Sequence, residues 1–278
     1  QEHHSATFMK TQRQICCVGE LIVDFVSTKE GAALAAAPGF LKHAGGAGAN
    51  VAAGLSRLGV RTAFIGTVGR DPFGTFLKRE LAGAGVNTSG LRTDDAHRTR
   101  LAFVSRPAPG EREFAFWEER PADEFLSPGE IGFRIIARSH IVHLSSFLLL
   151  KEPARSTALR IAQKAARSGQ MVSFDPNIRF SLWASRGEAR RCILEMVRLS
   201  SVLRLNDAEA RFLTGSSTVP GAARKLLGLG PLLVVITAGR RGCHAFNGRV
   251  SVSTAGFPVR TVDTTGCGDG FLAALLFG

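Results

Sequence analysis

The stretch DTTGCGD at residues 263–269, with the apolar run at residues 271–277 directly after it, decides how the end of the chain folds. Small residues before an apolar run predict a loop that opens a helix. The backbone amides of Gly266, Cys267 and Gly268 would then point into one space, because the first N–H groups of a helix have no partner within it. Those amides and the helix dipole attract phosphate oxygens, so the stretch predicts an anion-binding loop.

Asp269 stands at the end of this stretch, on the first turn of the expected helix. Its carboxylate could accept a proton from a bound hydroxyl, which is the task of a general base. The alternative is an ordinary acidic helix cap after a glycine-rich turn, and a Gly-x-Gly pattern alone does not exclude it. The complete seven-residue string favours a loop that holds a phosphate and a base together.

Outward from this stretch, short β-type runs alternate with helical patterns. Helical periodicity shows in Val51, Leu55 and Leu58, closed by Gly59, and again over residues 73–81. Such alternation predicts a three-layer α/β/α sandwich, in which helices cover both faces of a central, mostly parallel sheet. The candidate core strands are residues 15–18, 63–68, 140–144, 171–174, 202–205 and 232–236.

Two interruptions of this rhythm predict a small second sheet. Residues 101–105 and 113–117 are β-type runs joined by a turn-rich segment without a helix, so they indicate a hairpin. A second irregular segment follows the first strand at residues 25–40. We expect segments at about 25–41 and 98–120 to form a β-sheet lid inserted into one domain of residues 15–278.

A further hairpin is predicted near the end of the chain. Residues 243–246 and 249–253 are β-type runs on either side of Asn247 and Gly248. Asn-Gly is a strong signal for a tight turn, because both residues tolerate a positive φ.

The composition is that of a globular protein. Hydrophobic residues make up 45% and charged residues 21% of the 278, a composition that gives no sign of disorder and suits one large α/β domain with a small appendage. No apolar run reaches the ~18 residues of a membrane span, so no membrane partner is expected.

The surplus of 35 Lys and Arg over 23 Asp and Glu favours anionic partners such as nucleotides. Because the basic residues are spread singly, a solvated surface is favoured over a nucleic-acid site.

The five cysteines include no Cys-x-x-Cys pair, which indicates a reducing compartment, and the cytoplasm is expected. Cys16 and Cys17 on the first predicted strand are interpreted as core residues, and so are His140 and His143. Residues 1–14 are polar and contain no apolar stretch. They are expected to be a disordered tail or a cloning remnant rather than a secretory signal.

The string at residues 263–269 resembles the second signature of the ribokinase (PfkB-type) sugar kinases, with Cys267 where that family usually has Ala. The resemblance extends from about residue 15 to the end of the chain. It implies the ribokinase-like fold and an ATP-dependent carbohydrate kinase. In this interpretation Asp269 is the base, and the amides before it form the anion hole.

The stretch GGAGANVA at residues 45–52 resembles the first signature of the same family, which binds sugar. Gly45, Gly46 and Asn50 are therefore the expected sugar contacts. A dinucleotide-binding loop is the alternative for these glycines, but Val51 stands where its third glycine would be.

Asp24 and Arg179 match further substrate-binding positions of the family. Asp24, a carboxylate at the end of the first strand, can accept hydrogen bonds from two neighbouring sugar hydroxyls. Its alternative role is to begin a turn. Arg179 can bind a substrate oxygen or phosphate bidentately, and a structural ion pair is the alternative.

The resemblance also implies cation sites. Asn206 and Glu209 match an Asn-x-x-Glu motif that in relatives orders Mg²⁺-bound water and the nucleotide phosphates. Alone, this spacing is very common. Asp263 and Thr265 match positions that hold a monovalent cation, K⁺, in many relatives.

An ATP site follows from the last match. Thr237, Gly239 and Gly242 correspond to a strand end whose backbone approaches ATP in the family. An ordinary glycine-rich turn is the alternative. ATP, Mg²⁺ and K⁺ are thus the expected cofactors.

The substrate is predicted from finer resemblance. The segments at residues 24–26, 152–156 and 174–179 are most similar to fructokinases, which predicts conversion of fructose to fructose 6-phosphate. The alternatives are ribokinase, a nucleoside kinase, and 2-keto-3-deoxygluconate kinase, in which Arg179 and Arg120 would bind the substrate carboxylate.

A catalytically silent relative that binds sugar or nucleic acid is a different class of function. This alternative stays open because the sequence stops at Gly278, whereas relatives continue. The C-terminal part of the family is therefore expected to be missing after residue 278. The expected partners are a small-molecule sugar and ATP, with no nucleic acid, and a second copy paired through the lid.

Overall fold

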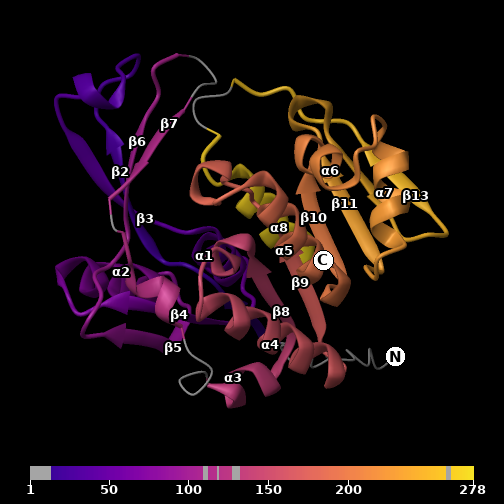
Figure 1. Ribbon diagram of the computed structural model, residues 1–278, viewed down its shortest axis with the longest axis horizontal. Coiled ribbons are helices and arrows are strands. Elements are labelled where there is room, and N and C mark those ends of the chain that lie inside the picture. Colours follow the sequence, from indigo (N-terminus) through magenta and orange to yellow (C-terminus); the bar gives the residue numbers. More distant parts are fainter. Residues whose placement is uncertain (1–13, 109–111, 118, 127–131, 261–263) are drawn as a thin grey trace, which may run out of the picture.

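A computed structural model describes most of the chain (Figure 1). Within the described ranges no helix is long and apolar enough to cross a membrane. Of the expected tail at residues 1–14, Gln14 begins the first strand and the rest lies outside these ranges. The described residues are 14–108, 112–117, 119–126, 132–260 and 264–278.

A nine-stranded sheet forms the centre of the molecule (Figure 1), in the order β13-β12-β11-β10-β9-β8-β1-β4-β5. Neighbours pair in parallel from β11 to β5, and antiparallel where β12 and β13 are involved. All six predicted core strands are present. The bounds are β1 Gln14–Val18, β4 Thr62–Gly69, β5 Asn87–Asp94, β8 Ser139–Ser145, β9 Met171–Asp175, β10 Val202–Asn206, β11 Leu233–Thr237, β12 Cys243–Phe246 and β13 Ser251–Thr254.

The edge strand β5 has no counterpart among the predicted strands. Its sequence NTSGLRTD is polar and contains Gly90, so it lacks the apolar alternation that indicates a strand. Gly90 is explained by a close approach: a Cβ there would lie 2.8 Å from the carbonyl oxygen of Phe64 on β4. The backbone pairing, rather than side-chain burial, defines this strand.

Helices cover both faces of the sheet, as predicted. Two separate apolar clusters show this, because one contains residues of α1, α2 and α8 and the other contains residues of α3 to α7. Val51 and Leu55 of α1 and Leu77 of α2 are buried as expected, whereas Leu58 is exposed at the end of α1. The bounds are α1 Ala47–Arg57, α2 Pro72–Gly83, α3 Phe133–Ala137, α4 Ala154–Arg167, α5 Arg186–Leu199, α6 Asp207–Thr214, α7 Val219–Leu227 and α8 Cys267–Phe277.

A separate four-stranded sheet stands beside the large one (Figure 1), in the order β3-β2-β6-β7. Aromatic rings hold it together: Phe103 stacks on Phe25 with ring centroids 5.1 Å apart and meets Phe40 edge-on at 5.2 Å. The hairpin predicted at residues 101–105 and 113–117 is present. The strands are β2 Ile22–Ser27, β3 Phe40–Gly45, β6 Leu101–Ser105 and β7 Glu113–Phe116.

The hairpin of β12 and β13 is present with a longer loop than predicted. The sequence placed a strand at residues 249–253, but β13 begins at Ser251. The side chain of Asn247 accepts hydrogen bonds from the amides of Arg249 and Val250, at 3.1 and 2.8 Å. These bonds draw both residues into the turn and remove them from the strand.

Candidate active site

The carboxyl ends of the parallel strands meet along one edge of the large sheet, and polar residues end four of them. Ser145, Asp175, Asn206 and Thr237 close β8, β9, β10 and β11. In open α/β sheets this edge is where ligands bind. The predicted site residues that the structure describes lie around this edge or on the loops next to it.

Asp269 lies on the first turn of α8 and is only 8% exposed. Its Oδ2 accepts a hydrogen bond from Nδ2 of Asn50 on α1, at 2.8 Å. The two helices can approach because Gly54 has no side chain: a Cβ there would lie 2.9 Å from Cβ of Ala273. The carboxylate therefore faces inward, toward the predicted sugar loop.

Asp24 reaches the same place from the small sheet. The sequence prediction put it at the end of the first strand, but it lies inside β2, because a bend at residues 19–21 separates β2 from β1. Its carboxylate packs against Gly45 at the end of β3, where any Cβ would overlap Oδ2 of Asp24. Burial raises the pKa of Asp24 to about 6, while the Arg179 guanidinium lowers it and Asp269 raises it. Asp24, Arg179 and Asp269 thus share one electrostatic environment.

The carboxyl of Asp269 has an unusual proton affinity. Burial raises its pKa to about 6, and the hydrogen bond from Asn50 acts in the opposite direction. Asp175 raises the pKa further, and the guanidinium groups of Arg179 and Arg204 lower it. A carboxylate that titrates near neutral pH can accept a proton from a hydroxyl and release it again, which suits a general base.

The start of α1 is fixed by a buried carboxylate that the sequence reasoning missed. Gly46 has a φ of 106°, and a Cβ there would overlap the carbonyl oxygen of Glu20. The carboxylate of Glu20 accepts hydrogen bonds from the amide of Ala47, at 2.5 Å, and from Oγ of Ser145, at 2.9 Å. Burial raises the pKa of Glu20 to about 7. These contacts hold Asn50, one turn further along α1.

The predicted anion-binding loop precedes α8. Gly266 is the N-cap of this helix and has a left-handed φ of 70°, which favours glycine. Of the three amides predicted to bind an anion, the one of Cys267 donates to the carbonyl of Thr264 at 3.2 Å. Gly268 lies in the first turn, where helical amides point out of the helix. The loop therefore retains the geometry of an anion site in part.

Asn206 and Glu209 form a complete capping box at the start of α6. Oδ1 of Asn206 accepts the amide of Glu209 at 2.8 Å, and Oε2 of Glu209 accepts the amide of Asn206 at 2.9 Å. Oε1 of Glu209 accepts the amide of Ile178 at 2.7 Å. Burial, with Asp175 next, raises the pKa of Glu209 to about 7. The two side chains join α6 to the β9 loop, and the Mg²⁺ contact stays a prediction.

The predicted ATP side begins where β11 ends. Thr237 lies beside Asn206 in the β10–β11 register, at the ligand-binding edge. Gly239 and Gly242 have φ values of 56° and 95°. A Cβ on Gly242 would overlap the carbonyl oxygen of Thr254, whereas nothing lies within 4 Å of one on Gly239. Gly242 is therefore required by the packing of the hairpin, and Gly239 borders open space.

Arg204 is a second residue that the sequence reasoning missed. Its Nη1 donates to Oδ2 of Asp175, and its Nη2 donates to Oγ1 of Thr237, both at 2.8 Å. The signal was available, because arginine inside the otherwise apolar strand VLRLN must be paired or functional. Asp175 was noticed only as part of a motif, yet it is buried at the end of β9, and its pKa is raised by burial.

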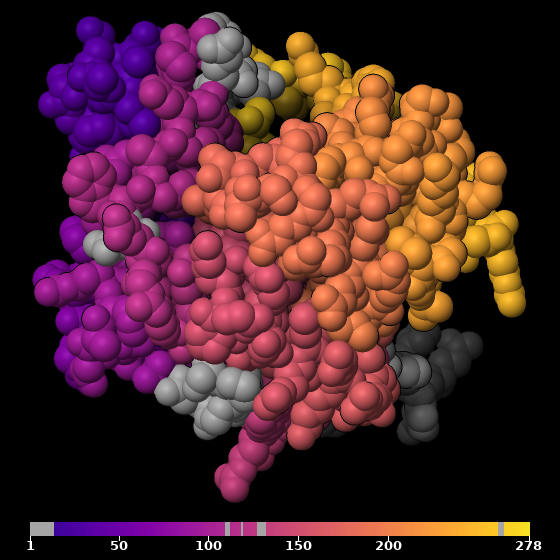
Figure 2. Space-filling view, viewed as in Figure 1, coloured from indigo at the N-terminus to yellow at the C-terminus, as the bar shows by residue number. Residues whose placement is uncertain are grey.

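The small sheet meets the loop before α8 through an arginine. Arg112 donates from Nη2 to Oγ1 of Thr264 at 2.7 Å. Arg179 faces the ring of Phe114 on β7, with 5.7 Å from its Cζ to the ring centroid. Figure 2 shows the surface hollowed between the indigo and magenta residues of the small sheet and the orange residues, with yellow C-terminal residues at its bottom.

The remaining predictions concern the K⁺ ligands and the cysteines and histidines that were interpreted as core residues. Asp263 lies outside the described residues, and Thr265 is exposed on the loop before α8. Among the described residues, no group of three or more His, Cys, Asp and Glu could hold a metal ion. Cys16 and Cys17 are buried, and so is His143, whose pKa burial lowers to about 4. They are core residues, as predicted, while His140 is half-buried.

Comparison with known proteins decides the family. The family described as "pfkB family carbohydrate kinase" matches residues 12–278. The chain belongs to the PfkB family of carbohydrate kinases. A fructokinase-2 of Solanum habrochaites is 41% identical to this PfkB kinase over 263 residues, which are 94% of this chain and 80% of that protein.

Two solved structures are similar to this PfkB kinase along most of its length. One is a double mutant of the fructokinase of Vibrio cholerae in a fructose-, ADP- and potassium-bound form, with 31% identity and a TM-score of 0.86, covering 96% of this chain and 83% of that one. The other is a sugar kinase of Pyrococcus horikoshii in complex with ATP, with 32% identity and a TM-score of 0.84, covering 94% and 83%.

Proposed function

We propose that this PfkB kinase transfers the γ-phosphoryl group of ATP to the 6-hydroxyl of fructose. The single observation that carries the proposal is the convergence of Asp269, Asn50 and Asp24 from α8, α1 and the small sheet. The similarity to plant fructokinases over 94% of the chain supports fructose as the sugar. So does the fructose bound to the related Vibrio cholerae protein.

Each site residue has a distinct role in the proposed reaction. Asp24, Gly45, Gly46 and Asn50 bind the sugar, with Asp24 accepting hydrogen bonds from its hydroxyls. Asp269 takes the proton of the reacting hydroxyl as that oxygen attacks phosphorus.

The chain supplies the anion hole from one loop and one side chain. The amides of Gly266 and Gly268 lie at the helix N-terminus, where they stabilise negative charge on the transferred group, while the amide of Cys267 donates to the carbonyl of Thr264. Arg179 supplies a cation near both carboxylates. In-line positioning then lowers the barrier, because little covalent chemistry falls to the protein.

The residues present fit a nucleotide. Thr237, Gly239 and Gly242 stand at the ligand-binding edge, and Gly239 borders open space into which phosphates or ribose can come close. Glu209 would hold Mg²⁺ through water, since each of its oxygens keeps a second lone pair. Asp263 and Thr265 would hold K⁺. These cations supply charge neutralisation for the phosphates.

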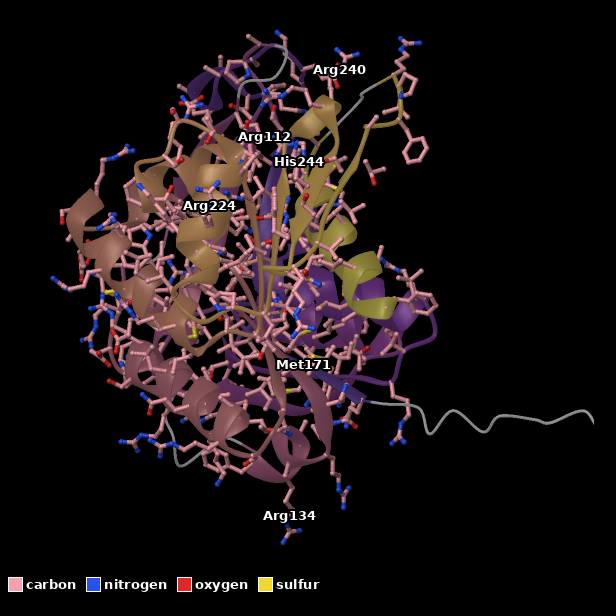
Figure 3. All side chains as sticks on the ribbon, turned by 90° about the vertical axis from the view of Figure 1, so that its right-hand side faces the viewer. Arg112, Arg134, Met171, Arg224, Arg240 and His244 are labelled. Atoms are coloured by element: carbon pink, nitrogen blue, oxygen red, sulfur yellow. The ribbon has the colours of Figure 1, made fainter. Side chains whose placement is uncertain are left out.

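The small sheet acts as the lid in this proposal. Its aromatic residues and Asp24 cover the sugar, and the Arg112–Thr264 hydrogen bond joins it to the anion-binding loop. Pairing of two copies through this sheet is part of the proposal, as is location in the cytoplasm. Figure 3 shows Arg134, Arg224 and Arg240 at well-separated places on the molecule, which favours a solvated surface over a nucleic-acid site.

A panel of sugars assayed with ATP tests the proposal. Fructose is expected to be phosphorylated with the highest kcat/KM, ahead of ribose and 2-keto-3-deoxygluconate. A preference for 2-keto-3-deoxygluconate would assign Arg179 and Arg120 to a carboxylate instead. Absence of turnover with every sugar, together with salt-dependent oligonucleotide binding, would favour the silent relative.

A further inference from the structure

Arg204 occupies a costly position in the fold. It lies on β10, which has neighbours on both sides in the nine-stranded sheet, between the buried residues Leu203 and Leu205. Its side chain is only 11% exposed. Burying a guanidinium costs free energy unless its hydrogen bonds are satisfied, so a position of this kind calls for an explanation.

The guanidinium spans two strand ends of the ligand-binding edge. Nη1 binds Asp175 at the end of β9, and Nη2 binds Thr237 at the end of β11. Asp175 is held in turn by the amide of Asn177, which donates to its Oδ1 at 3.1 Å. Because a guanidinium is planar and rigid, these two bonds fix its orientation.

The end of this guanidinium that carries Nη1 and Nη2 lies against the first turn of α8. A Cβ built on Gly268 would lie 2.8 Å from Nη1 and 3.1 Å from Nη2 of Arg204. The ring of Phe271, one turn further along α8, lies 5.9 Å from the guanidinium carbon. The absence of a side chain at Gly268 therefore leaves room for Arg204. It would also let a phosphate approach the backbone from the side opposite to Arg204.

The charge of Arg204 also reaches the site carboxyls. It lowers the pKa of Asp269, of Asp175 and of Glu209, because a nearby cation favours the ionised form. Its Nε is buried and has no hydrogen-bond partner among the described residues. The guanidinium is thus held by its two outer nitrogens, between the nucleotide side and the base.

We propose that Arg204 is a positioning residue for phosphoryl transfer. Its guanidinium sets the distance of the first turn of α8 from the strand ends, and therefore the position of the Asp269 carboxylate. Residue 268 is glycine because a side chain there would collide with Arg204. The proposal rests on the kinase activity proposed above. A wild-type assay with fructose and ATP establishes that activity first, so that the two can fail separately.

The alternative is a buried ion pair that only stabilises the fold. Such a pair lowers the thermal midpoint when it is broken, but leaves kcat of the folded enzyme unchanged. A positioning residue instead lowers kcat with little effect on the KM for sugar, because Asp24 and Asn50 are not touched. An error of about 1 Å at a reacting group can cost on the order of 10²-fold in rate.

The test is a double-variant cycle between Arg204→Gln and Gly268→Ala in the full chain. Glutamine keeps a donor for Asp175 but withdraws the edge that faces Gly268. We expect Arg204→Gln to lower kcat by about 10²-fold, with the KM for fructose within about threefold of wild type. In that background Gly268→Ala should cost at least tenfold less kcat than it does in the wild type, since the collision is gone.

Two outcomes would overturn the proposal. One is a kcat of Arg204→Gln within threefold of wild type, and the other is a cost of Gly268→Ala that is the same in both backgrounds. Should Arg204→Gln fail to fold, Arg204→Lys replaces it in the same cycle with the same criteria. Arg155→Gln is the matched control, because Arg155 is also partly buried and pairs with Glu188 at 2.8 Å, and its loss should leave kcat unchanged.

Discussion

The sugar side and the nucleotide side of the proposed active site are built differently. On the sugar side, Asp24, Asn50 and Asp269 are joined by hydrogen bonds and shared charge, and Asp269 is buried. On the nucleotide side, the turn at Gly239–Arg241 has no buried residue, and every residue of β13 is exposed. The chemistry is therefore expected to depend on preformed buried groups, while nucleotide binding depends on backbone shape.

Electrostatics separates the two sides in the same way. Burial raises the pKa values of Asp24 and Asp269 to about 6, so both carboxyls are partly protonated just below neutral pH. Arg240 on the nucleotide side is exposed, so solvent screens its charge, and this charge should have little effect on the rate. Substitutions on the sugar side should therefore alter rate and pH dependence, and those on the nucleotide side should alter stability and the KM for ATP.

The largest effect is expected from Asp269→Asn. An amide cannot accept the proton, so kcat should fall by about 10³-fold, within the range for loss of a general base. Binding of a fluorescent ATP analogue should stay within about threefold of wild type. Asp95→Asn is the control, because Asp95 is a solvent-exposed partner of Arg70. Retained turnover in Asp269→Asn would remove the base from this position.

Asp24→Asn should lower kcat/KM for fructose by about 10²-fold, mainly through KM, because a charged acceptor for sugar hydroxyls is lost. The sign of its pH effect is fixed. Asp269 raises the pKa of Asp24 by like charge. Because repulsion between two carboxylates is mutual, neutralisation of Asp24 should move the acidic limb of kcat to lower pH. A limb that moves to higher pH, measured with saturating fructose, would contradict the shared environment.

Asn50→Ala should move the acidic limb of kcat in the opposite direction, to higher pH. The hydrogen bond from Asn50 stabilises ionised Asp269, so its removal should raise the apparent pKa above the value of about 6. We expect kcat at pH 7 to fall about twofold, because a rise of about one unit in the apparent pKa lowers the ionised fraction of the base from about 0.9 to about 0.5. Identical acidic limbs in Asn50→Ala and wild type would show that this bond does not exist in solution.

The smallest effects are expected on the nucleotide side, from Gly242→Ala and its matched control Gly239→Ala. Both glycines have positive φ, a backbone conformation that costs alanine about 1–3 kcal/mol. Only Gly242 has a backbone oxygen in the way, so its variant should be less stable to urea by a further 1–3 kcal/mol or so. Equal stabilities would show that the hairpin can move away from this turn.

The pH dependence of stability provides an independent check on the sugar side. The folded-state pKa of Asp269 lies above its ordinary value of 3.8, so between about pH 4 and 6 the folded state binds more protons than the unfolded state. Stability from this group is therefore present at low pH and lost as pH rises through about 6. Asp269→Asn should remove that loss, which urea unfolding at pH 5 and pH 7 would measure.

Much of the fold could be predicted from the sequence, because apolar runs report burial directly. The six predicted core strands of the large sheet are all present, whereas the polar edge strand β5 and the lid strand β2 were not predicted as strands. The hairpin at Asn247 was predicted with a loop that was too short, since the reach of one side chain to two amides decides its length.

The site could be predicted as far as local motifs extend. Short motifs predicted Gly46, Gly266 and Asp269, because the backbone conformation at these positions depends on neighbouring residues in the sequence. The contact of Arg204 with Gly268 joins residues far apart in sequence, and so does that of Glu20 with Ser145. Only the strand order brings them together, which is why sequence reasoning missed both. Asp24 was assigned to the right site but to the wrong strand, because the bend after β1 left no clear signal.

The most direct measurement of the central claim is a crystal structure with fructose and a non-hydrolysable ATP analogue. We predict that the sugar 6-hydroxyl oxygen lies within about 3 Å of a carboxylate oxygen of Asp269, with Asp24 bound to other hydroxyls of the same ring. Fructose bound elsewhere, or a 6-hydroxyl out of reach of Asp269 while the γ-phosphate is in place, would contradict it.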